Sequence, residues 1–211
     1  MLTLYHYVHC PYCIRVRLAL GYLQIPFKSI VLAYDDEITP VKLSGSKMLP
    51  IISFEGKIMN ESLDIIKVID KNNVLSVKNP NLELDDYLNR LSKPLFSLLM
   101  PYWVFTAEFT DSSRNYFVHK KSIKRGPFEN LFKNRFILKQ EVEILLLEIE
   151  KNLRPFYQST SFSTFDIMLA SHLWSLFIIP EFIFSSKIYN YLMEIKKLCD
   201  FDYHADFWKK S

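Results

Sequence analysis

Glycine and cysteine are scarce in this sequence of 211 residues, and charge of neither sign dominates it. Four glycines and ten prolines exclude a collagen-like or low-complexity chain, and 49% apolar with 15% aromatic residues exclude intrinsic disorder. Three cysteines are too few for a disulfide framework. The net charge is +3, and the sequence shows no basic stripe of the kind that binds nucleic acids. Its length allows one large domain or two small ones.

Long hydrophobic runs are also missing. The most apolar stretch, residues 167–184, is interrupted by His172, Pro180 and Glu181, so it falls short of the ~20 apolar residues that a membrane-spanning helix needs. We expect a buried helix there instead. The first five residues lack the basic region and cleavage site of a signal peptide and predict a strand. Without a targeting signal and with unpaired cysteines, the chain is expected in the cytoplasm.

The first 72 residues mix short strand patterns with helical patterns. A helix is expected over residues 11–23, where Pro11 suits the first helical position and Cys10 becomes the N-cap. Gly21 lies inside this pattern and weakens the prediction of the last turn. Another helix is expected over residues 63–69, and strands over residues 2–7, 27–32, 51–54 and 57–59. The predicted order is β-α-β, a connector, then β-β-α.

Strand patterns stop at about residue 73. Asparagine and proline at residues 72–73 and 79–81 indicate a linker over residues 73–82. Apolar residues at three- and four-residue spacing then predict helices over residues 82–105, 128–157 and 163–179, the first kinked at Pro94 and Pro101. Periodicity thus predicts an α/β domain at residues 1–72 and an all-α domain at residues 83–211.

Several residues of the second half are expected to be structural. Ser163 and Asp166 have the spacing of a capping box, and Phe162 and Ile167 are placed as a hydrophobic staple around it. An aromatic run is expected mainly in the core, with the lining of a cleft between domains as the alternative. It comprises Tyr102, Trp103, Phe105 and Phe109, and core positions are also expected for His172 and Trp174.

Cys10 and Cys13, in the run Cys10-Pro11-Tyr12-Cys13, lie between the first expected strand and the first expected helix. Thiol–disulfide exchange needs a thiolate, and the N–H groups and dipole at a helix N-terminus stabilise negative charge. Cys13 follows one turn later on the same helix face, so it can attack a mixed disulfide on Cys10. We therefore predict Cys10 as the nucleophile and Cys13 as the resolving thiol.

Other interpretations of these residues stay open at the level of the sequence. Cys10 and Cys13 together with His6 and His9 are four potential zinc ligands within eight residues, although no second cluster of His or Cys supports such a site. The pair is also compatible with two unrelated buried thiols. Isolated Cys199 is expected to be a small core residue.

Residues 5–13, Tyr-His-Tyr-Val-His-Cys-Pro-Tyr-Cys, resemble the active-site strand and loop of a glutaredoxin. Residues 48–51 resemble the loop in which glutaredoxins and glutathione transferases keep a cis-proline, here Pro50. Residues 45–51 and 61–65 are similar to the long, two-domain glutaredoxins of bacteria, the glutaredoxin 2 type. The resemblance implies a thioredoxin-like domain followed by a helical domain, the architecture of glutathione transferases.

The resemblance also implies glutathione as cosubstrate, no metal, and a set of glutathione-binding residues. Glu61 would pair with the ammonium group of glutathione, Ser62 with the carboxylate beside it, and Lys47 with the glycine carboxylate. Leu49, before the cis-proline, would offer its backbone to the cysteine of the tripeptide. The expected glutathione-binding residues are Tyr12, Lys47, Leu49, Pro50, Glu61 and Ser62.

One departure from the family pattern concerns the charge near the nucleophile. Many glutaredoxins have a lysine two positions before the first active-site cysteine, and this sequence has Val8 there. What else stabilises the thiolate is therefore open, with the adjacent His9 as one candidate. The role of His6 is also open.

The function implied is glutathione-dependent reduction of protein disulfides and of glutathione mixed disulfides. Expected partners are glutathione and disulfide-containing or glutathionylated proteins, with no nucleic acid and no membrane, and a monomer is favoured over a homodimer. One alternative is a glutathione transferase on the same fold, which would use the thiolate of glutathione itself and leave Cys13 without a purpose. Another is a non-enzymatic, membrane-inserting protein similar to the chloride-intracellular-channel family.

Overall fold

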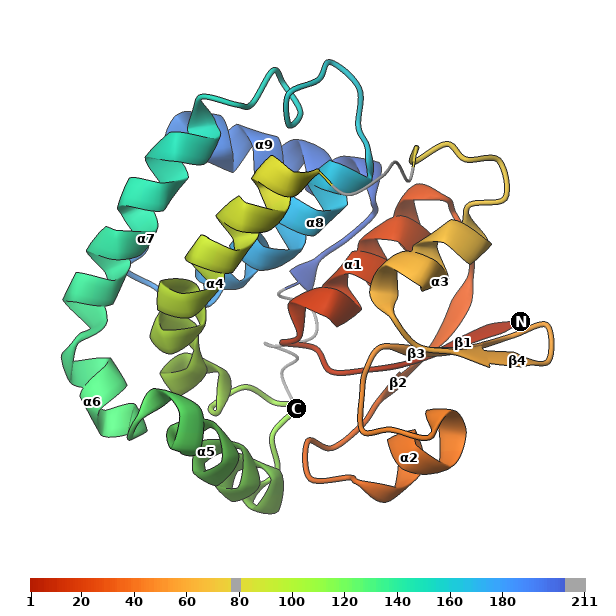
Figure 1. Ribbon diagram of the computed structural model, residues 1–211, viewed down its shortest axis with the longest axis horizontal. Coiled ribbons are helices and arrows are strands. Elements are labelled where there is room, and N and C mark those ends of the chain that lie inside the picture. The colour runs from red at the N-terminus through yellow and green to blue at the C-terminus, as the bar shows by residue number, and fades with distance from the viewer. Residues whose placement is uncertain (77–80, 204–211) are drawn as a thin grey trace.

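The computed structural model describes residues 1–76 and 81–203, in which a small sheet with its helices precedes a set of packed helices (Figure 1). Residues 1–76 form the N-terminal half and residues 81–203 the helical half. In chain order the elements are β1 (Leu2–His6), α1 (Pro11–Tyr22), β2 (Phe27–Val31), α2 (Ile38–Ser44), β3 (Ile51–Phe54), β4 (Lys57–Met59), α3 (Ser62–Ile69), α4 (Leu82–Trp103), α5 (Asp111–Arg125), α6 (Phe128–Lys133), α7 (Arg135–Glu150), α8 (Thr164–Leu173), the 3₁₀ helix η1 (Trp174–Ile178) and α9 (Ser186–Leu198).

The sheet of the N-terminal half has the strand order β2-β1-β3-β4. Strand β1 pairs parallel with β2 and antiparallel with β3, and β4 pairs antiparallel with β3. Helices α1 and α3 cover one face of the sheet and α2 lies on the other (Figure 1). This mixed sheet with helices on both faces confirms the predicted thioredoxin-like architecture, and the four strands fall where the residue pattern places them.

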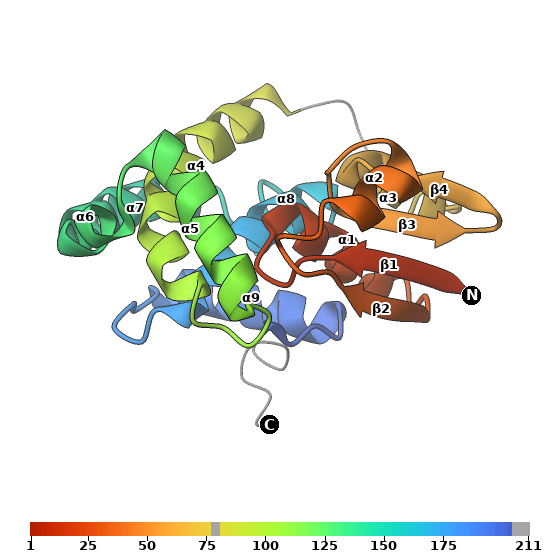
Figure 2. The ribbon, with the colours of Figure 1, turned by 90° about the horizontal axis from the view of Figure 1, so that it is seen from below.

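The helical half is arranged around α4, against which α6, α7, α8 and η1 pack (Figures 1 and 2). Asn81 caps α4 by accepting a hydrogen bond from the Leu84 N–H. Pro94 and Pro101 both lie inside this helix, which is assigned as one span from Leu82 to Trp103. The predicted all-helical second half is confirmed by this arrangement.

Several predicted boundaries are wrong. The connector between the second and third strands contains α2, and the helix expected over residues 128–157 is interrupted at Asn134, giving α6 and α7. Helices α5 and α9 were not expected; α5 is mostly polar and buries only Ser113 and Phe117. The predicted linker over residues 73–82 and the domain end at residue 211 include residues 77–80 and 204–211, which lie outside the described residues.

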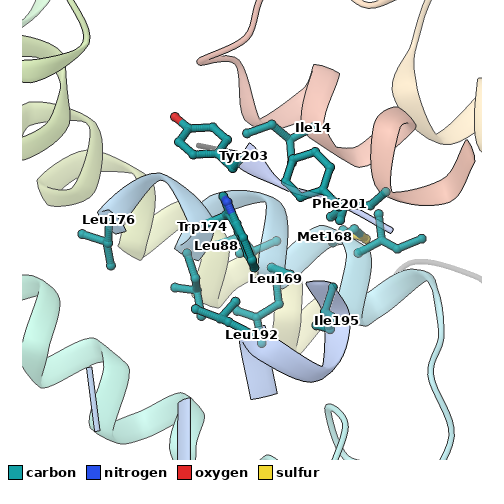
Figure 3. Packing of buried hydrophobic residues seen from close by; sticks show 14 of the residues in the cluster. Ile14, Leu88, Met168, Leu169, Trp174, Leu176, Leu192, Ile195, Phe201 and Tyr203 are labelled. Carbon is teal, nitrogen blue, oxygen red and sulfur yellow. The ribbon is translucent and has the colours of Figure 1, made fainter. Parts of the chain in front are cut away.

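Both halves contribute to one hydrophobic core. Ile14 of α1 packs near Phe201 and Tyr203, above Trp174 and the apolar side of α8 and α9 (Figure 3). Helix α1 also packs directly against α3 and α8. The element that starts at the cysteine pair is therefore fixed by neighbours from both halves.

The capping box at the start of α8 is present as predicted. The Asp166 carboxylate accepts hydrogen bonds from the Ser163 N–H at 2.9 Å, the Tyr157 N–H at 2.8 Å and the Tyr191 hydroxyl at 3.1 Å. These bonds satisfy a buried carboxylate and hold the segment before α8 onto the helix. They confirm a structural role for Asp166.

Gly21 allows α1 to approach the end of α9. A Cβ atom at this position would lie 1.7 Å from the carbonyl oxygen of Cys199, well inside van der Waals contact. The glycine that weakened the sequence prediction is thus explained by packing, and the helix continues through it to Tyr22.

We expect Gly21→Ala to destabilise the protein by about 1–3 kcal/mol, because the added methyl group overlaps backbone that cannot move away cheaply. The sign of the change in the free energy of unfolding is informative, since Gly→Ala inside a helix without such a neighbour stabilises by about 0.5–1 kcal/mol. Urea unfolding measures the difference. A Gly21→Ala protein as stable as the wild type would contradict the close approach.

Candidate active site

The site begins where β1 ends and α1 starts. Cys10 is the N-cap of α1, with extended backbone, and Pro11 occupies the first helical position. The Ile14 N–H donates to the Cys10 carbonyl at 2.9 Å, which closes the first turn. Cys10 is partly exposed and Cys13 is buried, and both are free thiols. The predicted placement of the two cysteines at the helix start is confirmed.

The pKa of the Cys10 thiol is lowered to about 6. The hydrogen bond with the Cys13 thiol lowers it most, and the charge of His9 lowers it further. The backbone N–H groups at the start of α1 act in the same direction, whereas burial raises it. At neutral pH the Cys10 sulfur is therefore mainly a thiolate, which is the nucleophilic form.

The other two thiols behave in the opposite way. Burial is the main cause that raises the pKa of Cys13 well above its ordinary value, and its sulfur accepts a hydrogen bond from the Tyr7 N–H at 3.5 Å. Burial also raises the pKa of Cys199 to about 12, and this residue lies in the core as expected. Cys10 thus differs from both other cysteines in exposure and in charge.

A cavity of about 270 Å³ opens beside Cys10. Tyr12, Lys47 and Leu49 from the predicted glutathione site line it, while Pro50, Glu61 and Ser62 do not. The peptide bond between Leu49 and Pro50 is cis, as the resemblance implied. The rest of the wall comes from both halves of the molecule and consists of Tyr7, His9, Cys10, Pro11, Tyr34, Met48, Phe96, Met100, Trp103, Phe117 and Lys121.

Lys47 is held in place by groups near the cavity. Its Nζ donates to the Tyr34 carbonyl at 2.9 Å and to a Glu37 carboxylate oxygen at 3.1 Å. The Tyr116 hydroxyl, from α5, also donates to that Glu37 oxygen. The predicted partner of a ligand carboxylate thus already has a carboxylate partner of its own.

Glu61 and Ser62 lie at the start of α3. Ser62 is the first residue of the helix and is buried, whereas Glu61 precedes it and is exposed. Glu61 has φ = 68°, a left-handed backbone that a residue with a Cβ rarely adopts. Such backbone persists where the surroundings enforce it, and it is common at ligand-binding positions. The two residues thus form a separate, polar corner at the helix start.

The wall supplied by the helical half could not be found from the sequence. Lys121 and Phe117 lie on α5, a mostly polar helix that buries few residues, and Trp103 ends α4. Burial lowers the pKa of Lys121, while the charge of Cys10 opposes this effect. Trp103 is the member of the predicted aromatic run that lines this cavity. Tyr102 and Phe105 instead border a cavity of about 900 Å³ between α4, α5 and α6, which contains no cysteine.

The two histidines before Cys10 have different partners. His6 Nε2 lies 2.7 Å from the Ser29 hydroxyl of β2. His9 Nδ1 donates to the Glu108 carboxylate at 2.6 Å, and Glu108 belongs to the segment between α4 and α5. Among residues 1–76 and 81–203, no group of three or more His, Cys, Asp or Glu side chains is arranged to hold a metal ion. His172 is a core residue whose Nδ1 lies 2.9 Å from the Met168 carbonyl.

We expect iodoacetamide to alkylate Cys10 of the reduced protein with a rate that rises through a midpoint near pH 6, because only the thiolate reacts. Cys13 and Cys199 should stay unmodified in the folded protein at neutral pH, since burial raises both pKa values. Peptide mass spectrometry of samples quenched at a series of pH values measures this. Cys10→Ser should abolish the reaction near pH 6. A midpoint near that of a free cysteine would refute the assigned charge state.

Comparison with known proteins identifies the family. Residues 4–76 match the family "Glutathione S-transferase, N-terminal domain", and residues 83–206 match "Glutaredoxin 2, C terminal domain". Glutaredoxin 2 of Escherichia coli (strain K12) is 30% identical over 197 residues, which cover 90% of this chain and 92% of that protein. Most of the chain is therefore shared with that relative.

Two solved structures extend this result. Glutaredoxin 2 from Salmonella typhimurium, crystallised in complex with glutathione, has a TM-score of 0.87 and 28% identity, with 96% of each chain covered. Glutathione transferase GSTFuA2 from Phanerochaete chrysosporium has a TM-score of 0.74 and 16% identity, over 95% of this chain and 99% of that one, a likeness of fold alone. With both halves matched in order, the chain belongs to the glutaredoxin 2 family.

Proposed function

We propose that this protein, a glutathione-dependent thiol–disulfide oxidoreductase, uses Cys10 as its nucleophile and Cys13 as its resolving thiol. One observation carries the proposal: a partly exposed thiol of lowered pKa opens on a cavity, and a buried thiol of raised pKa lies one helical turn behind it. That asymmetry gives the two cysteines different chemical roles. Its substrates are disulfide-containing and glutathionylated proteins.

With a glutathionylated substrate, the Cys10 thiolate attacks the glutathione sulfur of the mixed disulfide. A Cys10–glutathione disulfide forms, and the substrate sulfur leaves as a thiolate and takes up a proton. The thiolate of a second glutathione then attacks the glutathione sulfur bound to Cys10. Oxidised glutathione is released, so its disulfide replaces the one broken in the substrate, and the Cys10 thiolate is restored.

With a protein disulfide, Cys10 forms a mixed disulfide with one substrate sulfur and releases the other as a thiol. Cys13, after losing its proton, attacks Cys10 and frees the second substrate thiol, leaving a Cys10–Cys13 disulfide. Two glutathione molecules reduce that disulfide through a glutathionyl adduct on Cys10. Because Cys13 is buried, its sulfur reaches only a disulfide of which Cys10 is one half.

Glutathione is proposed to lie across the cavity with its sulfur toward Cys10. Leu49 and Tyr12 border the position of its cysteine, and Pro50 holds the Leu49 backbone beside the cavity. Lys47 and Lys121 line the cavity from the two halves of the molecule and favour a tripeptide of net negative charge. Glu61 and Ser62 at the start of α3 suit the γ-glutamyl end, since a carboxylate and helix N–H groups match an ammonium and a carboxylate.

We further propose that the protein acts as a monomer in the cytoplasm, on protein thiols rather than on nucleic acid or membranes. No helix of the part of the chain described is long and apolar enough to cross a membrane. Conjugation of glutathione to electrophiles, the transferase chemistry, is the less favoured function although tyrosines border the cavity, because Cys10 beside it is ionised. A thiolate at position 10 forms disulfides with glutathione, whereas conjugation needs a hydroxyl that stabilises the glutathione thiolate.

We expect Cys10→Ser to abolish glutathione-coupled reduction of a small glutathione mixed disulfide, because no other described thiol is both exposed and ionised. Cys13→Ser should retain most of this activity and lose the reduction of a protein disulfide, which needs the second thiol. Coupled assays with both substrates on the three proteins measure the difference. Equal loss in both variants on the small substrate would refute the division of roles. Conjugating activity that survives Cys10→Ser would favour the transferase interpretation.

We expect Glu61→Gln and Ser62→Ala each to raise the KM for glutathione about tenfold, since each removes one hydrogen bond to a charged group of the ligand. The kcat should change little, because neither residue borders Cys10. Asp64→Asn, an exposed acid one turn later on α3, is the matched control and should behave as the wild type. A KM unchanged in both variants would remove this corner from the glutathione site.

A further inference from the structure

Glu108 is buried, and among the described residues the donors to its carboxylate all belong to the two residues before Cys10. It accepts from the Val8 N–H at 2.8 Å, the His9 N–H at 3.0 Å and His9 Nδ1 at 2.6 Å. Its side chain is 5% exposed, and that of His9 is 6% exposed. The carboxylate comes from the helical half and the three donors from the loop between β1 and α1, about a hundred positions away in sequence. The loop that presents Cys10 is therefore fixed from the other half of the molecule.

The His9 ring is enclosed by aromatic side chains. Its neighbours, at centroid distances of 5.1–5.7 Å, are Tyr7, Tyr34, Trp103, Phe109 and Phe117. Taking an ionisable pair out of water costs several kcal/mol, and a buried pair alone is weak support for a purely stabilising role. Its position beside the nucleophile suggests a different purpose.

The chemistry of the pair fixes the state of the ring. The charge and hydrogen bond of His9, with the two backbone N–H groups, lower the pKa of Glu108 despite the opposing effect of burial. An ionised carboxylate only accepts hydrogen bonds, so Nδ1 of His9 carries a proton. With Nδ1 turned to Glu108, the ring lies beside Cys10, and the charge of His9 lowers the pKa of the Cys10 thiol.

We propose that Glu108 is a positioning residue for the thiol chemistry: it holds the His9 ring, through its Nδ1–H, in place beside Cys10, so that the helical half sets the reactivity of a cysteine in the N-terminal half. This inference rests on the proposed role of Cys10 as nucleophile. It gives His9 and Glu108 the task that a lysine two positions before the cysteine performs in many glutaredoxins, where this chain has Val8.

Other groups face Cys10 and remain in place when Glu108 is changed. They are Cys13 and Arg15 on α1, Tyr7 after β1, Tyr34 after β2 and Lys121 on α5. Arg15 and Lys121 are cations that favour the thiolate independently of His9. Glu108 itself is an anion, and its direct field opposes a thiolate nearby, as it does at Cys13. The direct and the indirect effects of Glu108 on Cys10 therefore have opposite signs.

Because these two effects have opposite signs, the direction in which the Cys10 pKa shifts in a Glu108 variant tests the proposal. In reduced, full-length protein carrying Glu108→Gln, the pH dependence of Cys10 alkylation by iodoacetamide should shift upward by about one pH unit. The alkylation rate near pH 6 should fall several-fold, because His9 loses the carboxylate that holds its ring beside Cys10. A carboxylate that acted only through its own field would shift the midpoint downward, and a purely structural role would leave it unchanged. Either of these results would overturn the proposal.

A His9 variant tests whether Glu108 acts on Cys10 through the His9 ring. His9→Gln alone should raise the midpoint by a similar amount, and adding Glu108→Gln to it should produce no further rise. Glu129→Gln, an exposed glutamate on α6, is the control and should leave the midpoint unchanged. If Glu108→Gln fails to fold by circular dichroism, the His9→Gln protein decides, and an unshifted midpoint there overturns the proposal. The titration uses no glutathione, so an inactive wild type would refute the proposed function and not this inference.

Discussion

The packing of α1 between two sets of helices is the constraint on which the site depends. On one side α1 lies on the sheet next to α3, and on the other it packs against α8 of the helical half. Gly21 near its end admits the Cys199 backbone, and Ile14 near its start joins the shared core. Because the helix is fixed at both ends, its N-terminus points in one direction. Cys10, at this end of the helix, is therefore held beside the N–H groups that stabilise a thiolate.

Burial and direct contacts both affect the pKa values of the ionisable groups near the cysteine pair. Arg15 is buried on α1 and stacks on the Tyr12 ring at 4.6 Å, and burial lowers its pKa. Next to it His172 is kept neutral, since burial and the charge of Arg15 lower its pKa to about 3. His9 has a carboxylate in contact, and His172 has a backbone carbonyl. The two buried histidines are thus given different partners, and His9 is the one whose charge lowers the pKa of Cys10.

The parts of the site that the sequence predicts are those built from neighbouring residues. Cys10 and Cys13 follow from a strand, a proline and a helical pattern within a dozen positions, and the capping box of Ser163 and Asp166 spans only four. These features are local, so spacing alone reveals them. The thioredoxin-like order of strands and helices is readable for the same reason, apart from α2, which is short and buries only Pro40.

The parts that escape prediction are long-range contacts. Lys121 reaches the cavity from α5, a mostly polar helix with only two buried residues. The break between α6 and α7 at Asn134 interrupts an apolar pattern that is continuous in the sequence. Glu108 is an ordinary acid in a loop until folding brings it to Val8 and His9. Periodicity reports which face of an element is buried, and it carries no information on which distant loop will meet it.

A helical half that forms one wall of the cavity changes what a thioredoxin-like half can do alone. The N-terminal half holds both thiols and the start of α1, whose N–H groups favour a thiolate. The opposite wall, with Trp103 and Lys121, closes the cavity and adds positive charge on the side that the sheet does not reach. The carboxylate that holds the loop before Cys10 comes from the same half. Separation of the two halves would therefore remove at once a wall of the ligand cavity and part of the field at the sulfur, which makes their shared core a condition of the chemistry and not only of stability.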